Sequence, residues 1–194
     1  MKNPTKSKQD IELASKFTVA DYEKARDAKV PDRDAIAKAI HRRFLERYIE
    51  PVLQPKKKHG FAIMAVSCLI IETLVSFRRG WKHSRGKSED AFRRFFKCAD
   101  SFSAFREHSK DFYENVRCGI LHQAETTGGW LILRDGPLLD PRADTITINA
   151  TEFIKQLEKF LEKFCEDLKS KDWDSTEWKN VIIKMNVIVK NCEP

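Results

Sequence analysis

Glycine and proline are both scarce in this chain, at 7 residues each among 194. Because both residues interrupt regular structure, their scarcity excludes a fold built from long loops and favours helices joined by short connections. The N-terminal segment 1–10 lacks the apolar core of a secretion signal. We therefore expect a cytoplasmic protein.

The signatures of most enzyme classes are also missing. The sequence contains no GxGxxG, P-loop, HExxH or nucleophile-elbow pattern. Its 5 cysteines include no CxxC pair, and its 5 histidines are scattered rather than spaced like zinc ligands. We therefore expect neither a metal ion nor another cofactor.

A long uninterrupted hydrophobic run is lacking as well. The most apolar stretch is 60–77, but Glu72 interrupts it, and Arg78 and Arg79 follow it directly. A membrane helix needs about 20 mostly apolar residues. The stretch therefore predicts a helix that is buried by other helices, and no membrane partner.

What the chain has in excess is positive charge and phenylalanine. Lys and Arg number 36 against 29 Asp and Glu, which gives a formal net charge of +7. This excess favours a polyanionic partner, although it is also common among proteins that bind no polyanion. Hydrophobic residues make up 41% of the chain and include 13 Phe, which is enough for one core rich in aromatic rings.

Helical periodicity of the apolar residues predicts most of the fold. The expected helices cover about 18–28, 32–53, 60–77, 88–102, 112–125, 149–168 and 174–189. Ser88, Asn149 and Asp174 are the expected N-caps, and Glu152 and Glu177 follow the last two at the spacing of a capping box.

Two short segments interrupt this helical pattern. Residues 130–133 (WLIL) and 145–148 (TITI) are rich in β-branched and apolar residues, and a loop rich in Asp, Gly and Pro separates them. They predict a two-stranded β-hairpin over about 129–149. We expect residues 1–17 to be a flexible N-terminal tail, and residues 18–192 to form a single all-α domain, an up-and-down helical bundle with this small hairpin inserted.

The segment 112–123, FYENVRCGILHQ, combines an apolar helix face with Arg117 and His122. Their separation on a regular α-helix amounts to about 500° of rotation, so the two side chains leave the axis roughly 140° apart. They can converge through the long reach of arginine, through a distortion near Gly119, or through a second protomer. Otherwise they only solvate the edge of a core helix. Gly119 lowers helix propensity by about 1 kcal/mol relative to Ala, which suggests that another backbone segment approaches closely.

The segment NVRCGILHQ resembles the R-x4-6-H motif of HEPN domains, a family of helical bundles. The match consists of Arg117, four intervening residues and His122. The basic, helical character of the chain and the hairpin after the motif also resemble HEPN-type proteins found on plasmids and other mobile elements. The resemblance covers about residues 30–170.

This resemblance implies a HEPN-like bundle and a metal-independent endoribonuclease that acts as a homodimer, with the motif helices of two protomers facing across one cleft. His122 is then the general base or acid, since imidazole groups exchange protons near neutral pH. Arg117 is then the clamp for the phosphate and for the charge of the transition state. RNA is the expected substrate, a toxin or antiviral defence system is the expected setting, and an antitoxin-type protein is a further expected partner.

One residue departs from the family pattern. Active family members commonly carry Asn, Asp or His directly after the motif arginine, and here Cys118 stands at that position. Tyr113, Asn115 and Gln123 are either substrate-contacting neighbours of the motif or ordinary surface residues. The main alternative is a non-catalytic HEPN-like protein that binds RNA or nucleotide or acts as a dimeric adaptor. A helical interaction domain without a nucleic-acid partner is a third reading.

Glu72 lies in the most apolar of the expected helices. Burying a lone carboxylate is costly, so this one must be paired or solvated. We expect either an ion pair with Arg117, which would orient its guanidinium, or a position on the only solvated strip of the helix.

Basic residues form the last candidate feature. The expected nucleic-acid contacts are Arg78, Arg79, Lys82 and Arg85, with further basic runs at Lys56–Lys58 and Arg93–Arg94. On the motif side of the bundle they would form a track for phosphates. The alternative is that they are ordinary solvated loop residues.

Overall fold

The computed structural model of the chain describes residues 7–53 and 59–192. The basic run Lys56–Lys58 lies outside the described residues. The α-helices are α1 (Val19–Asp27), α2 (Arg33–Phe44), α3 (Glu50–Leu53), α4 (Gly60–Arg79), α5 (Ser88–Cys98), α6 (Ser109–Asp111), α7 (Gly119–Gln123), α8 (Ala150–Ser170) and α9 (Thr176–Lys190). The 3-10 helices η1 (Lys8–Asp10) and η3 (Asp100–Phe105) and the π-helices η2 (Leu45–Ile49) and η4 (Phe112–Cys118) complete the helical part. The strands are β1 (Glu12–Ala14), β2 (Phe17–Thr18), β3 (Trp130–Leu133), β4 (Leu139–Pro141) and β5 (Ile146–Asn149).

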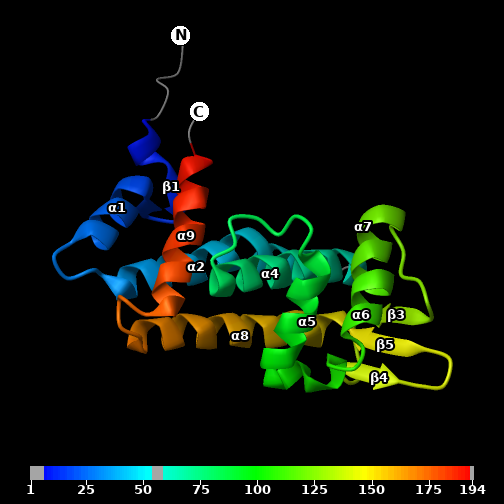
Figure 1. Cartoon of the computed structure of the whole chain (residues 1–194). Helices are drawn as coiled ribbons and strands as arrows, with labels where there is room; N and C mark the ends of the chain where they lie inside the picture. Colours follow the sequence, from blue (N-terminus) through cyan, green and yellow to red (C-terminus); the bar gives the residue numbers. More distant parts are fainter. Residues whose placement is uncertain (1–6, 54–58, 193–194) are drawn as a thin grey trace, which may run out of the picture.

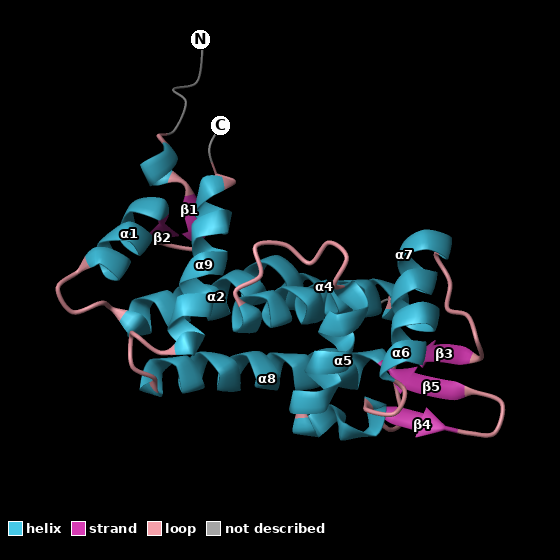
Figure 2. Cartoon of the chain, in the orientation of Figure 1, coloured by secondary structure: helices cyan, strands magenta, loops and turns pink. Residues whose placement is uncertain are grey.

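The helices pack around two long ones, α4 and α8, which contact each other along the molecule (Figure 1). α2 packs on α8, while α5 and α9 pack on α4. Figure 2 shows α1 and α9 at one end of the molecule, and α6, α7 and the strands β3–β5 at the other. The predicted class, mainly helical with a small β insertion, is confirmed.

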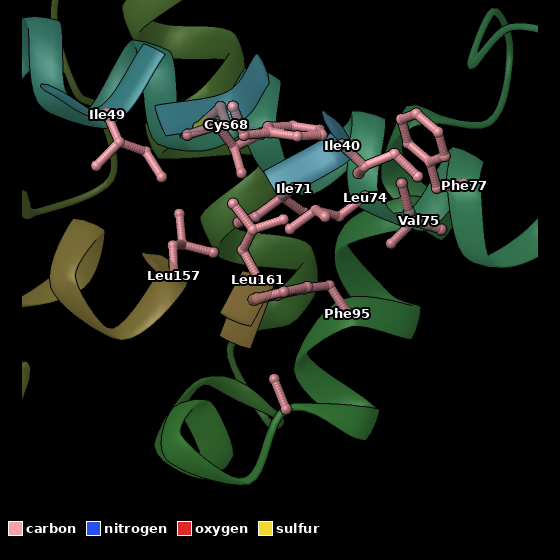
Figure 3. Close-up of a cluster of buried hydrophobic side chains, with 14 of the residues drawn as sticks. Ile40, Ile49, Cys68, Ile71, Leu74, Val75, Phe77, Phe95, Leu157 and Leu161 are labelled. Carbon is pink, nitrogen blue, oxygen red and sulfur yellow. The ribbon is translucent and has the colours of Figure 1, made fainter. Parts of the chain in front are cut away.

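Helix α4 is the central helix of the core. Side chains from α2, α4, α5 and α8 meet around it, among them Ile40, Ile71, Phe95 and Leu161 (Figure 3). In the described part of the chain, α4 alone is long and apolar enough to cross a membrane, but 56% of its apolar window is buried inside the fold. Such burial agrees with the prediction of a helix covered by its neighbours.

Phenylalanine rings form a second part of the core, as the composition predicts. Phe92, Phe96, Phe105 and Phe153 surround Phe112, and their ring centroids lie 5.1–5.8 Å from it. All of these rings are fully buried. Because Phe112 is the first residue of η4, this cluster fixes the start of the segment that carries Arg117.

The prediction of a two-stranded hairpin was wrong. The region forms a three-stranded sheet in the order β3-β5-β4, in which β3 is parallel and β4 antiparallel to β5. A tight turn cannot join two parallel strands, so the chain between β3 and β5 has to cross over, and it forms β4 on the way. Leu139–Pro141 gave no strand signal because it contains Asp140 and Pro141, and proline is accommodated here on an edge strand.

The flexible N-terminal tail predicted for residues 1–17 is corrected in its described part, while residues 1–6 lie outside the described residues. Residues 8–17 are ordered by the 3-10 turn η1 and by an antiparallel pairing of β1 with β2. Leu13 is only 1% exposed, and its carbonyl oxygen accepts a hydrogen bond from Arg43 Nη1. A few apolar residues in a polar segment are therefore enough to attach it to α2.

The predicted helix caps are only partly correct. Asn149 does cap α8, where its side chain accepts a hydrogen bond from the Glu152 amide at 3.0 Å. The cap of α9 is Ser175 rather than Asp174. Ser88 is the first residue of α5, whose N-cap is Lys87, and its hydroxyl donates to Glu72 instead of capping the helix.

Truncating Phe112 should therefore destabilise the whole fold. We expect Phe112→Ala to lower the free energy of unfolding by about 3–5 kcal/mol, because it removes a buried ring and leaves a cavity. The matched control is Phe61→Ala, whose side chain is 37% exposed and whose loss should cost under about 1 kcal/mol. Urea denaturation followed by circular dichroism measures both, and equal losses would contradict the packing described here.

Candidate active site

The motif arginine lies in a π-helical turn. Arg117 belongs to η4, which follows α6 and passes directly into α7 at Gly119. In a π-helix each amide bonds to the carbonyl five residues earlier, so side chains are rotated by less per residue than in an α-helix. The two side chains therefore diverge by less than the 140° expected for a regular helix. The distortion near Gly119, one of the three possible routes to convergence, is present. Such π-turns occur frequently at functional sites.

Gly119 is required where η4 ends. After α7 the chain turns back at Ala124, whose φ is 56°, and brings the backbone of Glu125 over the glycine. A Cβ atom on Gly119 would lie 2.5 Å from the carbonyl oxygen of Glu125. The predicted close approach of another backbone segment is thus confirmed.

Arg117 forms an ion pair with Glu72 on α4. Arg117 Nε lies 2.9 Å from Glu72 Oε1, and the two side chains are only 17% and 13% exposed. The second carboxylate oxygen accepts a hydrogen bond from Ser88 Oγ at 3.0 Å. Of the two alternatives for Glu72, the structure confirms the ion pair with Arg117 and excludes a position on a solvated strip of the helix.

The ion pair also sets the charge state of the arginine. Burial alone would lower the pKa of Arg117, but the charge of Glu72 and the hydrogen bond that Arg117 donates to it outweigh burial, so the pKa lies above its ordinary value. The guanidinium therefore stays a cation throughout the physiological range. A permanent charge held in one orientation can bind a phosphate without first being ordered.

His122 completes the pair within the same chain. It lies exposed on α7, with Nε2 at 3.5 Å from Arg117 Nη1. The π-turn and the reach of the arginine are therefore sufficient for convergence, and a second protomer is not needed for it. The arrangement offers a fixed cation beside a solvent-accessible imidazole.

Tyr113 and Cys118 border this pair. The guanidinium carbon of Arg117 lies 5.7 Å from the centre of the Tyr113 ring. Burial and a hydrogen bond with the Cys118 thiol raise the pKa of Tyr113. Cys118 therefore lies beside the arginine and is partly buried.

The other two predicted neighbours, Asn115 and Gln123, form no hydrogen bond with Arg117 or His122 in the described part of the chain. Asn115 holds the loop after α7, because its Oδ1 accepts from Thr127 Oγ1 at 2.8 Å and its carbonyl oxygen from the Thr127 amide at 3.0 Å. Gln123 is exposed at the end of α7. The structure thus gives Asn115 a role in holding the loop.

The predicted basic track divides into separate groups. Arg78 and Arg79, at the end of α4, line a hollow with α8 and α9, and none of the motif residues lines it. Lys82 and Arg85 are exposed in the loop that leads to Ser88. Arg93 and Arg94 both pair with Asp90 on their own helix.

Ser88 is the residue of this site that sequence reasoning missed. A serine just before a helical pattern is a typical N-cap signal, and that signal hid the bond to Glu72. Among residues 7–53 and 59–192 there is no group of His, Cys, Asp and Glu side chains that could hold a metal ion. The candidate site therefore consists of Glu72, Ser88, Arg117 and His122, bordered by the aromatic ring of Tyr113.

Comparisons of the chain with family models, with curated proteins and with solved structures gave no match. The relation to HEPN domains therefore remains a resemblance in the motif. What the site can do has to be argued from its own geometry.

Neutralising Glu72 should destabilise the fold as well as the site. We expect Glu72→Gln to lower the free energy of unfolding by about 2 kcal/mol, somewhat less than for a fully buried pair, because the Arg117 charge loses its counter-ion. The control is Glu114→Gln, which breaks an exposed pair with Lys110 and should cost under about 0.5 kcal/mol. Thermal or urea unfolding measures both, and a loss no greater than that of the control would show that the pair is not important for stability.

Proposed function

We propose that this chain is a metal-independent endoribonuclease of the HEPN type that acts as a homodimer in the cytoplasm. The observation that carries this proposal is the Arg117 guanidinium, held by Glu72 and turned toward the exposed imidazole of His122 at 3.5 Å. The R-x4-H spacing and the mainly helical fold are in keeping with it. A role in a toxin or defence system, with an antitoxin-type partner, belongs to the same proposal.

The chemistry follows from the two residue types. The 2′-hydroxyl of RNA attacks the adjacent phosphorus, a bond from phosphorus to the 2′-oxygen forms, and the bond to the 5′-oxygen of the next nucleotide breaks. His122 accepts the proton from the 2′-hydroxyl or supplies one to the departing 5′-oxygen. Arg117 stabilises the charge that develops on the phosphoryl oxygens. The products carry a 2′,3′-cyclic phosphate and a 5′-hydroxyl.

A homodimer would complete this site. One chain offers a single imidazole at the motif, whereas the reaction uses one group as base and another as acid. Leu69, one helical turn from Glu72, is 43% exposed, and Leu121, one turn from Arg117, is 49% exposed. Contiguous exposed apolar patches mark protein interfaces, and we propose that these two leucines belong to one. A second copy packed on them would bring its own His122 to the same cleft.

The non-catalytic alternative is supported by one residue. Cys118 replaces the more polar side chain that commonly follows the motif arginine, and it contacts Tyr113 rather than being directed at solvent. If that side chain is essential, the chain binds RNA at Arg117 without cleaving it. Cleavage assays separate the two functions.

Removing either motif side chain should abolish cleavage. In EDTA we expect wild type to cleave RNA, and His122→Ala to lose about 10²–10⁴-fold in rate because the proton-transfer group is gone. Arg117→Lys keeps the charge but loses the planar fork, and should lose about 10²-fold or more. The rate of RNA cleavage is followed by gel electrophoresis.

The control for this series is His83→Ala, which removes an exposed imidazole from the loop before α5 and should leave the rate unchanged. Equal cleavage by all four proteins would exclude the roles given to Arg117 and His122. RNA binding without any cleavage by wild type would favour the non-catalytic alternative.

The dimer should depend on the leucines beside the motif. We expect Leu121→Lys to convert a dimer into a monomer at micromolar concentration, because it places a charge in an apolar interface. Leu131→Lys is the control, since Leu131 is equally exposed, at 48%, but lies on β3. Analytical ultracentrifugation measures the mass of each protein. A monomeric wild type, or equal dissociation by both substitutions, would contradict this interface.

A further inference from the structure

A groove opens along α8, and none of the motif residues lines it. It has a volume of about 740 Å³ and lies where the C-terminal end of α4 meets α8 and the start of α9. Neither Arg117 nor His122 lines the groove, so the groove and the Arg117–His122 pair are distinct sites. Figure 1 shows α9, whose start borders the groove, and α7, which carries His122, on opposite sides of α5. Nothing in the proposed reaction uses the groove.

The groove is lined by cations that lack acidic partners. Arg79, Lys159 and Lys163 line it, and no carboxylate of the described residues pairs with any of the three. Lys159 and Lys163 are one turn apart on α8 and both are exposed. Three carboxylates also line it. Asp100 pairs with Arg106 and Glu177 with Lys171 at exposed positions, while Asp167 has no ion pair among the described residues, so unpaired cations outnumber unpaired carboxylates. The groove therefore presents unpaired positive charge.

Aromatic side chains lie between these cations. Phe160 and Phe164, also one turn apart on α8, are half-buried and line the groove. The guanidinium of Arg78 lies over the Phe160 ring, 5.5 Å from its centre, and donates to Cys98 Sγ. The cation is thus held at the wall of the groove. Planar cations and aromatic rings are the surfaces on which unpaired bases stack.

We infer that this groove binds a single strand of RNA, with phosphates on Arg79, Lys159 and Lys163 and a base against Phe164 and Arg78. The inference rests on the proposed function, since the bound strand would be the continuation of the RNA that is cut at Arg117. Helix α4 connects the two sites, because Glu72 and Arg79 lie about 10 Å apart along its axis. An acidic protein segment would use the cations but would gain little from the rings.

The experiment measures RNA binding apart from cleavage. The protein is the full chain with His122→Ala, and the probe is a fluorescein-labelled oligouridylate, with anisotropy recorded over a range of salt concentrations. The groove variant adds Lys159→Ala and Lys163→Ala, two exposed substitutions that should leave the thermal midpoint unchanged. The control adds Lys29→Ala and Lys190→Ala, which remove the same charge from exposed positions outside the groove.

We expect the groove variant to bind the probe about tenfold more weakly or worse, and the slope of log K against log salt to become shallower by about 1.4, since each phosphate contact to a single strand contributes about 0.7. The control should bind like the parent protein. An unchanged slope in the groove variant, an equal loss in the control, or equally tight binding of polyglutamate would overturn the inference. Cleavage by the chain with an intact motif tests the proposed function separately, so either can fail without the other.

Discussion

The ion pair between Glu72 and Arg117 is the interaction on which the rest of the site depends. Glu72 lies on the central helix of the core, where a lone carboxylate would be strongly destabilising, and Arg117 is the cation that neutralises it. The same contact fixes the guanidinium in one orientation. Ser88 takes the remaining carboxylate oxygen and thereby joins α5 to the pair. The contact that joins α4, α5 and η4 therefore contributes both to the stability of the fold and to the proposed function.

The position of Arg117 is set by the core as much as by its partner. Phe112, at the start of the π-turn, is enclosed by other phenylalanine rings, and Gly119, at its end, allows the chain to return over it. Between these fixed points the helix has to accommodate an extra residue per turn. The outcome is an arginine and a histidine that meet although their spacing is unsuited to a regular helix.

The helices were predictable because their apolar residues repeat at helical spacing over long segments, as in α4 and α8. The parallel pairing of β3 with β5 was not predictable, because the relative direction of two strands depends on the path that the chain takes between them. At the site, residue types allowed Glu72 to be matched with Arg117, because a buried carboxylate needs a cation. The role of Ser88 could not be foreseen. In the sequence, a serine that caps a helix cannot be distinguished from a serine that binds a distant carboxylate. The periodicity of apolar residues does not reveal the π-turn either. Such a turn inserts one residue into a helix and requires no particular residue type.

The most direct test of the proposed function incubates the protein in EDTA with an RNA and with a copy of it methylated at every 2′-oxygen. Attack by the 2′-hydroxyl predicts that the unmodified RNA yields 2′,3′-cyclic phosphate and 5′-hydroxyl ends and that the methylated copy stays intact. Mass spectrometry of the products distinguishes these ends. Cleavage of the methylated copy, or fragments that end in a 3′-hydroxyl, would contradict the mechanism assigned to Arg117 and His122.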